Sequence, residues 1–222
     1  MTQLLENIEI ETAPNPEVAI IWLHGLGADG NDFVPIVREL DLAGLPGIRF
    51  VFPHARTMPV TINGGYVMRA WYDIVVTDLT RREDETGLRA SQREVEALIA
   101  REKARGIPAS RIILAGFSQG CAMTLQTGLR HPEKLAGMLC LSGYLPLASV
   151  AGAERNEASL QTPVFMAHGR QDPVVPFQRA EQSRDALQAL GYQVEWHEYQ
   201  MQHSLCMEEV QDISGWIRKV IS

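Results

Sequence analysis

A serine stands between two glycines near the middle of the chain, in the segment GFSQG at residues 116–120. The apolar run Ile112–Ala115 precedes it and predicts a buried strand, and a helix is expected from Gln119 to about Leu129. Small neighbours let a serine occupy a strained turn between strand and helix, where its hydroxyl can attack a carbonyl. The alternative is a glycine-rich turn in which Ser118 only caps the helix. Because strand, motif and helix stand in the required order, the pattern favours a nucleophilic Ser118.

A serine hydroxyl is a weak nucleophile at neutral pH and needs a base that is itself oriented by a carboxylate. In folds that carry this motif, the chain order is serine, acid, histidine. Asp172 follows the apolar run Val164–Ala167, in a loop where active-site residues of open parallel sheets collect. The structural alternative is that Asp172 and Pro173 only initiate a turn. The placement after a strand favours Asp172 as the acid.

Six histidines compete for the role of base, and four of them precede Asp172 in the chain: His24, His54, His131 and His168. His197 lies inside the alternating segment Gln193–Tyr199, which is typical of a strand, and we expect it to be structural or solvent-facing. His203 follows that strand in a loop before the last predicted helix. A loop after the last strand can bring an imidazole back to Ser118, so we predict that His203 is the base.

Acyl transfer also requires hydrogen-bond donors for the oxyanion. One expected donor is the backbone N–H of Gln119, the residue after the nucleophile. The other is the backbone N–H of Leu26, in the glycine-rich segment HGLGADG at residues 24–30. The competing interpretation is a phosphate-binding loop, but the segment lacks both the GxGxxG spacing and the lysine of a P-loop.

The remaining sequence indicates how these residues are positioned. Short apolar runs typical of strands buried on both faces lie at Val18–Leu23, Ile48–Phe52, Ile112–Ala115, Gly137–Leu141 and Val164–Ala167. Apolar residues at helical spacing lie at Leu88–Arg105, Phe177–Leu190 and Leu205–Ile221. This alternation predicts an α/β fold, with a mostly parallel sheet flanked by helices on both faces, in a single domain over residues 1–222. The longest irregular stretch, Pro53 to Thr86, is expected to be functional.

Composition narrows the function. The net charge of −7 argues against nucleic acid or an anionic membrane as the main partner, since both require basic surfaces. The first residues lack the features of a signal peptide, and no apolar run approaches the roughly 20 residues that span a bilayer. The chain has three cysteines, an odd number, and none of them has CxxC spacing. This pattern argues against a disulfide framework and against a zinc site, so we expect a cytoplasmic protein without a metal.

Five segments carry a family resemblance, in this order: HGLGADG, PVTINGGYVMRAWYDI, AGFSQGCAM, HGRQDPVVP and QMQHSLC. From about Val18 onward, the chain resembles the bacterial carboxylesterase and acyl-protein thioesterase family of α/β-hydrolases. The resemblance implies an α/β-hydrolase fold without a large cap domain. By matched position it implies the triad Ser118, Asp172 and His203, with Leu26 and Gln119 as oxyanion donors. It also implies that Trp71 lines the acyl pocket.

The resemblance implies a serine hydrolase that needs no cofactor. We expect it to cleave carboxylic esters of short to medium acyl chains. The alternatives are an acyl-protein thioesterase or a lysophospholipase with the same triad, and, more remotely, a non-catalytic binding protein of the same fold. The expected partners are small or lipid-like esters and lipidated proteins, and the resemblance points to a homodimer. The candidates for one wall of an apolar groove are Met58, Val60, Ile62, Met68 and Trp71, and those for another are Val174 and Val175. The alternative is that these are minor core residues beneath a loop, and the groove is favoured only for Trp71.

Overall fold

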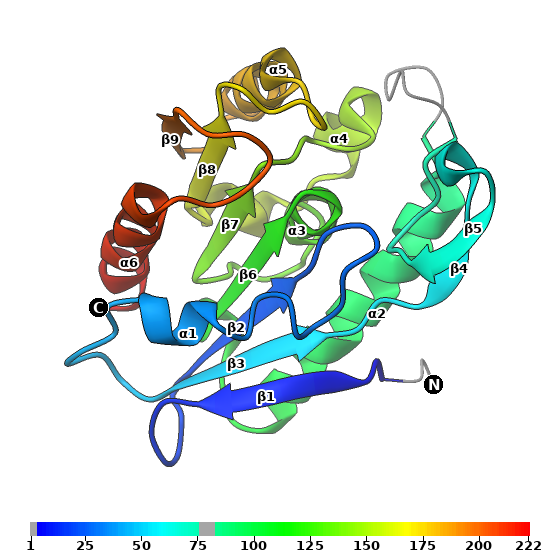
Figure 1. Ribbon diagram of the computed structural model, residues 1–222. Helices are drawn as coiled ribbons and strands as arrows, with labels where there is room; N and C mark the ends of the chain where they lie inside the picture. Colours follow the sequence, from blue (N-terminus) through cyan, green and yellow to red (C-terminus); the bar gives the residue numbers. More distant parts are fainter. Residues whose placement is uncertain (1–3, 76–82) are drawn as a thin grey trace.

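The computed structural model describes residues 4–75 and 83–222 and has a seven-stranded sheet at its centre (Figure 1). Its strands, in spatial order, are β1 (Asn7–Glu11), β3 (Ile48–Pro53), β2 (Val18–Leu23), β6 (Ile112–Phe117), β7 (Gly137–Leu141), β8 (Val164–Gly169) and β9 (Val194–Tyr199). Every neighbouring pair is parallel except β1 and β3. The predicted mostly parallel sheet is therefore confirmed.

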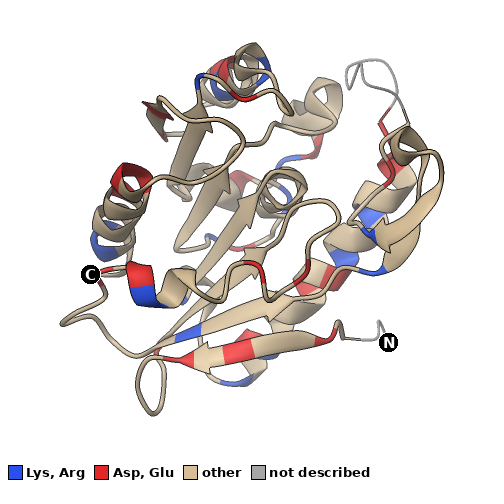
Figure 2. Ribbon diagram, in the orientation of Figure 1, with Lys and Arg blue, Asp and Glu red and all other residues tan. Residues whose placement is uncertain are grey.

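The central strands are buried because their side chains are apolar on both faces. Every residue of β2, β3, β7 and β8 is buried. The strands β2, β6, β7 and β8 contain no Lys, Arg, Asp or Glu, and Figure 2 shows the charged residues mainly on the helices and on β1. Both faces of these strands must consequently be covered by other elements.

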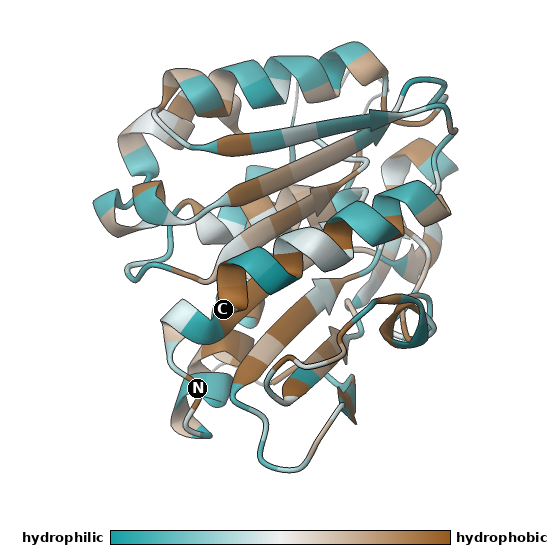
Figure 3. Cartoon of the chain, turned by 90° about the vertical axis from the view of Figure 1, so that its left-hand side faces the viewer, coloured by the Kyte–Doolittle hydropathy of each residue, from teal (hydrophilic) through white to brown (hydrophobic). Residues whose placement is uncertain are grey.

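Helices cover the two faces of the sheet: α1 (Ile36–Glu39), α2 (Glu85–Ala104), α3 (Gln119–Gly128), α4 (Ala148–Glu154), α5 (Phe177–Ala189) and α6 (Met207–Ile221). The short α1 and the long α6 pack on one face and contribute to a single core cluster. The other four lie on the opposite face, where two further clusters form. Figure 3 looks onto the side of α6 and shows hydrophobic central strands behind helices that carry both hydrophilic and hydrophobic residues. Helices on both faces are confirmed.

The strand β1 was not predicted from the sequence. Its five residues NIEIE alternate between polar and apolar, and it pairs antiparallel with β3 at the edge of the sheet. The alternation fits an edge strand with one solvated face, but five residues give a weak signal.

The stretch from Pro53 to Thr86 was predicted to be irregular, and this is wrong for its first half. It contains a hairpin of β4 (Thr57–Val60) and β5 (Tyr66–Arg69). The turn uses Gly64 and Gly65, whose φ angles of 67° and 79° lie in the region that glycine adopts without strain. Residues 76–82 of the stretch lie outside the described part of the chain.

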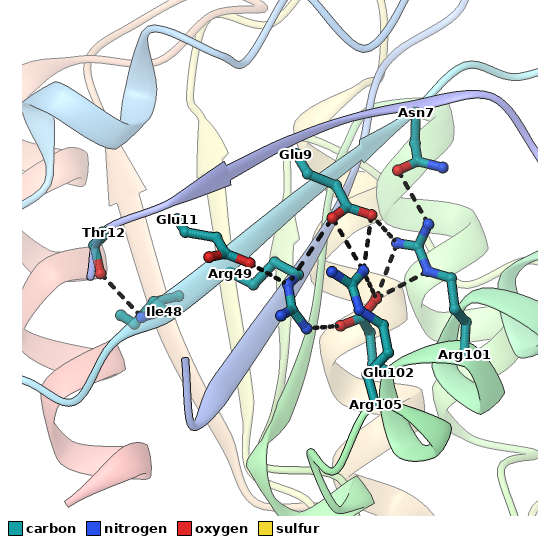
Figure 4. A network of polar contacts seen from close by, with 9 residues as sticks. All are labelled: Asn7, Glu9, Glu11, Thr12, Ile48, Arg49, Arg101, Glu102 and Arg105. Carbon is teal, nitrogen blue, oxygen red and sulfur yellow. Dashed lines mark hydrogen bonds and ion pairs between the residues drawn. The ribbon is translucent and has the colours of Figure 1, made fainter. Parts of the chain in front are cut away.

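A network of charged side chains fastens β1 to its neighbours (Figure 4). The fully buried carboxylate of Glu102, on α2, binds Arg49 of β3 at 2.8 Å. Arg49 also binds Glu11 of β1 at 2.9 Å, and Arg105 of α2 binds Glu9 of β1 at 2.9 Å. The network links the edge strand to a helix beneath the sheet, at the amino ends of the parallel strands.

Candidate active site

Ser118 occupies a turn that only small neighbours permit. Its φ of 56° and ψ of −116° place a non-glycine residue in a strained region. A Cβ atom on Gly116 would lie 2.2 Å from the carbonyl oxygen of Gly120. One on Gly120 would lie 2.1 Å from the carbonyl oxygen of Leu23. The two glycines therefore allow α3 to start directly against β6 and β2, with Ser118 at the apex.

The structure brings Ser118, His203 and Asp172 together from loops that follow β6, β9 and β8. The Nε2 atom of His203 lies 2.9 Å from the Ser118 hydroxyl, and its Nδ1 atom lies 2.6 Å from Asp172 Oδ2. The ring of Phe117 packs against the imidazole with 4.7 Å between centroids. This arrangement can move a proton from the serine hydroxyl to an imidazole that a carboxylate orients.

The Asp172 side chain is fully buried but remains well suited to carry charge. Its Oδ1 accepts hydrogen bonds from the backbone N–H groups of Val174 at 2.8 Å and Val175 at 2.9 Å. Burial raises the pKa of Asp172, but hydrogen bonds from His168, His203 and the two amides outweigh that effect and hold the pKa well below its usual range. The carboxylate is therefore ionised at neutral pH and can stabilise a protonated His203.

The expected oxyanion donors lie beside the serine. Leu26, Ser118 and Gln119 line the same cavity. Backbone hydrogen bonds among the described residues use neither the Leu26 nor the Gln119 N–H, while the neighbouring Gly27 N–H is bound to the Arg69 carbonyl at 2.9 Å. Gln119 is also the first residue of α3, where helix geometry leaves N–H groups without an intrahelical acceptor. Both donors are thus available to a substrate oxygen.

Trp71, which was predicted to line the pocket, lies beneath the loops that form it. Its indole N–H donates to the His24 carbonyl at 2.9 Å, and its backbone N–H donates to Gln119 Oε1 at 2.8 Å. The Gln119 side chain also donates to the Tyr72 carbonyl at 2.7 Å. Trp71 is almost completely buried and is absent from the cavity lining. It joins the loop after β2 to the start of α3.

His24 supports the same loop as a neutral ring. Burial lowers the pKa of His24 to about 4, which outweighs the opposing hydrogen bond to Gly25. The Nδ1 atom lies 2.7 Å from the Gly25 carbonyl and therefore carries the proton, and Nε2 accepts from the Ala55 N–H at 3.0 Å. These bonds fix the backbone next to Leu26.

A cavity of about 430 Å³ opens beside Ser118. Its walls are Leu26, Ile62, Asn63, Tyr72, Ile74, Ser118, Gln119, Tyr144, Pro173, Val174, Val175 and Pro176. Of the expected wall residues, Ile62, Val174 and Val175 line it, whereas Met58, Val60 and Met68 do not. Tyr72 and Tyr144 were not predicted, and their hydroxyls share a hydrogen bond of 2.7 Å. The walls are mainly apolar, as an acyl chain requires.

His197, the other histidine that follows Asp172 in the chain, has partners of its own. His197 stacks on Phe165 with 4.7 Å between ring centroids and lies 3.3 Å from both Glu195 and Asp212. Among residues 4–75 and 83–222, no three His, Cys, Asp or Glu side chains are grouped so that they could hold a metal ion.

The chain is similar to known proteins over almost its whole length. The profile of the phospholipase/carboxylesterase family matches residues 5–221. The chain belongs to this family. It is accordingly an enzyme of the esterase and thioesterase type with an α/β-hydrolase fold, as the sequence predicted.

Curated relatives and solved structures of this family cover nearly the whole chain. Acyl-protein thioesterase 1 of Neurospora crassa is 42% identical over 208 residues, which are 89% of this chain and 84% of the relative. Acyl-protein thioesterase 1 of Yarrowia lipolytica is 38% identical over 91% of each chain. The crystal structure of Arabidopsis thaliana SOBER1 superposes with a TM-score of 0.87, at 32% identity, over 92% of this chain and 99% of SOBER1. That of esterase PE8 superposes with a TM-score of 0.83, at 26% identity, over 98% and 100%.

Proposed function

We propose that this phospholipase/carboxylesterase family member hydrolyses acyl thioesters, with lipid-modified proteins as its substrate class, through Ser118, His203 and Asp172. The observation that carries the proposal is the continuous contact from the Ser118 hydroxyl through His203 to Asp172, at 2.9 and 2.6 Å. It supports covalent acyl transfer because each group stands at the distance that proton transfer requires.

In the proposed mechanism, His203 Nε2 removes the proton of Ser118 as Oγ attacks the acyl carbonyl carbon. The backbone N–H groups of Leu26 and Gln119 stabilise the oxyanion. Collapse of the intermediate releases a thiol, or an alcohol from an ester, which takes the proton from His203. A water molecule then attacks the acyl-enzyme with His203 as base. Asp172 orients the imidazole and stabilises its charged form throughout.

The substrate class rests on two kinds of support. The cavity beside Ser118 has apolar walls, which suit an acyl chain. Relatives at 38% and 42% identity are named acyl-protein thioesterase 1. These names favour the thioesterase alternative over the first expectation of short- to medium-chain esters. Ester hydrolysis remains the second candidate function, and similarity to a structure titled esterase supports it.

The test compares kcat/KM for a palmitoyl-peptide thioester with values for p-nitrophenyl esters from acetate to palmitate. We expect the highest value for the thioester and a rise with chain length among the esters. A maximum at short esters, with negligible thioester cleavage, would favour the carboxylesterase instead. Ser118→Ala is the blank for both. A wild-type protein that neither turns over these substrates nor reacts with a fluorophosphonate would indicate a binding protein.

Two further expectations accompany this function. Four of the large apolar residues that remain exposed are Ile62, Tyr66, Val67 and Val174. Burying them between two copies of the chain would be a physical reason for a homodimer. Sedimentation velocity at several concentrations tests whether the chain forms a homodimer.

A cytoplasmic location is the expectation from free thiols at Cys121, Cys140 and Cys206. None of the described helices is long and apolar enough to cross a membrane.

A further inference from the structure

A second imidazole contacts the carboxylate of Asp172. His168 lies in β8, four residues before the acid, with only 1% of its surface exposed. Its Nε2 atom lies 2.9 Å from the Val175 carbonyl oxygen and 3.3 Å from Asp172 Oδ2. The same Oδ2 atom is the one that faces His203. The sequence pointed away from His168 because it precedes the acid and cannot be the base.

The surroundings of His168 determine which nitrogen carries the proton. A carbonyl oxygen can only accept, so the bond to Val175 requires a proton on Nε2. The Nδ1 atom is buried and has no hydrogen-bond partner among the described residues. The Nε2–H is therefore directed toward the Val175 carbonyl, with Asp172 Oδ2 3.3 Å from the same nitrogen.

This N–H completes the coordination of the carboxylate. Val174 and Val175 donate their amides to Oδ1, while His168 and His203 face Oδ2. Val175 contacts both residues: its N–H donates to Asp172, and its carbonyl accepts from His168. The two imidazoles are the titratable side chains in contact with Asp172 in the part of the chain that the structure describes. Asp172 is thus contacted both by its own loop, through Val174 and Val175, and by His168 of β8.

We propose that His168 is a positioning residue for the hydrolytic reaction, whose Nε2–H holds Asp172 Oδ2 in line with His203 Nδ1 and withdraws part of its negative charge. This inference rests on the proposed function of the triad. It has two consequences. The first is alignment, since a donor on the strand fixes the carboxylate before substrate binds. The second is electronic, since a carboxylate that faces the His168 N–H in addition to its three hydrogen bonds is a weaker base than one with the three hydrogen bonds alone.

Substitution of His168 by Phe removes the donor and keeps a ring of similar size. We expect His168→Phe to lower kcat about tenfold, the size of effect that loss of one hydrogen bond to a charged group produces, with KM changed less than about twofold. The freed carboxylate stabilises a protonated His203 more strongly, so the acid limb of the kcat/KM profile moves to higher pH. His168→Gln places an amide N–H near the position of Nε2 and should restore both properties.

The experiment measures pH profiles of kcat and kcat/KM for the wild type, His168→Phe and His168→Gln. Concentrations are corrected by active-site titration with a fluorophosphonate. His197→Phe is the matched control, because His197 is also a histidine packed on the sheet but does not contact Asp172. If His168→Phe does not fold, His168→Asn replaces it, since its shorter amide falls at the Nδ1 position and cannot reach Oδ2.

The outcomes separate this inference from the function on which it rests. Unchanged kcat and an unmoved acid limb in the donor-free variant would overturn the role of His168 while leaving the triad intact. Equal losses in the Phe and Gln variants, without a shift of the limb, would reduce His168 to a packing residue. A wild-type protein without turnover would instead defeat the proposed function. In that case the low-field proton resonance of the His203–Asp172 bond still tests His168, because it should move in His168→Phe and return in His168→Gln.

Discussion

Two polar networks lie at opposite ends of the sheet and are built differently. At the carboxyl ends of the strands, Ser118, His203 and Asp172 form a short linear chain in which Asp172 supplies the only formal charge when His203 is neutral. At the amino ends, Glu102 and Arg49 belong to a cluster of fully charged groups that bridges three elements. The first includes a strained backbone at Ser118, whereas none of the residues named in the second has a positive φ.

The two networks are expected to contribute to different properties of the protein, one to the proposed reaction and the other to stability. In the ionic cluster, opposite charges compensate one another, so its effect falls on the free energy of unfolding. In the proposed triad, a proton can move along the hydrogen bonds, so we expect substitutions there to change the barrier to acyl transfer. Substitutions in the two networks should therefore change different measurements.

The largest effect is expected from Ser118→Ala. Loss of the nucleophile should reduce kcat by about 10^4- to 10^6-fold, because triad members act as a unit. His203→Ala should produce a loss of similar size. Steady-state turnover, with thermal unfolding as a parallel measurement, tests this. Substantial residual turnover in either variant would assign the chemistry to another residue.

Glu102→Ala is the counterpart in the ionic cluster. Removing a buried carboxylate leaves Arg49 without its nearest partner, and we expect the free energy of unfolding to fall by about 3–5 kcal/mol while kcat changes less than about twofold. Urea denaturation and turnover of the same sample provide the two measurements. Glu133→Ala is the control, since the Glu133 ion pair with Lys103 is exposed and should contribute less than about 1 kcal/mol. An equal decrease of the free energy of unfolding in Glu102→Ala and Glu133→Ala would show that the buried ionic cluster contributes no more to stability than an exposed ion pair.

Glu209 belongs to neither network and gives a smaller, pH-dependent effect. Burial raises its pKa to about 8, with Asp212 adding to the shift and the Cys206 amide opposing it. The folded protein therefore keeps a proton that the unfolded chain releases above about pH 4.5, so the free energy of unfolding falls as the pH rises from 4.5 to 8. Glu209→Gln should match the wild type at pH 5 and exceed it by about 3–4 kcal/mol at pH 8.

Urea denaturation at the two pH values measures this difference. The neighbouring Glu208 is exposed, so Glu208→Gln is a suitable control and should change the free energy of unfolding little at either pH. A Glu209→Gln variant that is destabilised equally at both values would show that the carboxylate is ionised and bound in the folded protein.

His197→Ala should have the smallest effect on activity. His197 contacts Glu195 and Asp212 on the α6 side of the sheet and does not reach Ser118. We expect kcat/KM within about twofold of the wild type and a loss of stability of about 1 kcal/mol or less. A large loss of turnover would require exchanging the roles assigned to His197 and His203.

The residues of the proposed triad were easier to predict from the sequence than the contacts around them. Ser118 was identified from a local turn motif, and Asp172 and His203 from their positions after strands, which a parallel sheet brings to one edge. The contact of His168 with Asp172 depends on the path of the loop between them, which spacing alone does not specify. The orientation of Trp71 depends likewise on its bonds to His24 and Gln119, two segments distant in sequence. The β4–β5 hairpin was not predicted, because strands of four residues are too short to show a clear alternation of polar and apolar residues.

The order of the strands has a consequence for synthesis of the chain. The proposed nucleophile and its proposed base are 85 residues apart, and His203 follows β9, which is the last strand of the sheet in sequence. At a translation rate of roughly 5–20 residues per second, Ser118 is added to the chain about 4–17 s before His203. During that interval the hydroxyl has no base. If the proposed triad is correct, we expect a nascent chain to be unreactive toward acyl groups until His203 has been made and β9 has paired with β8.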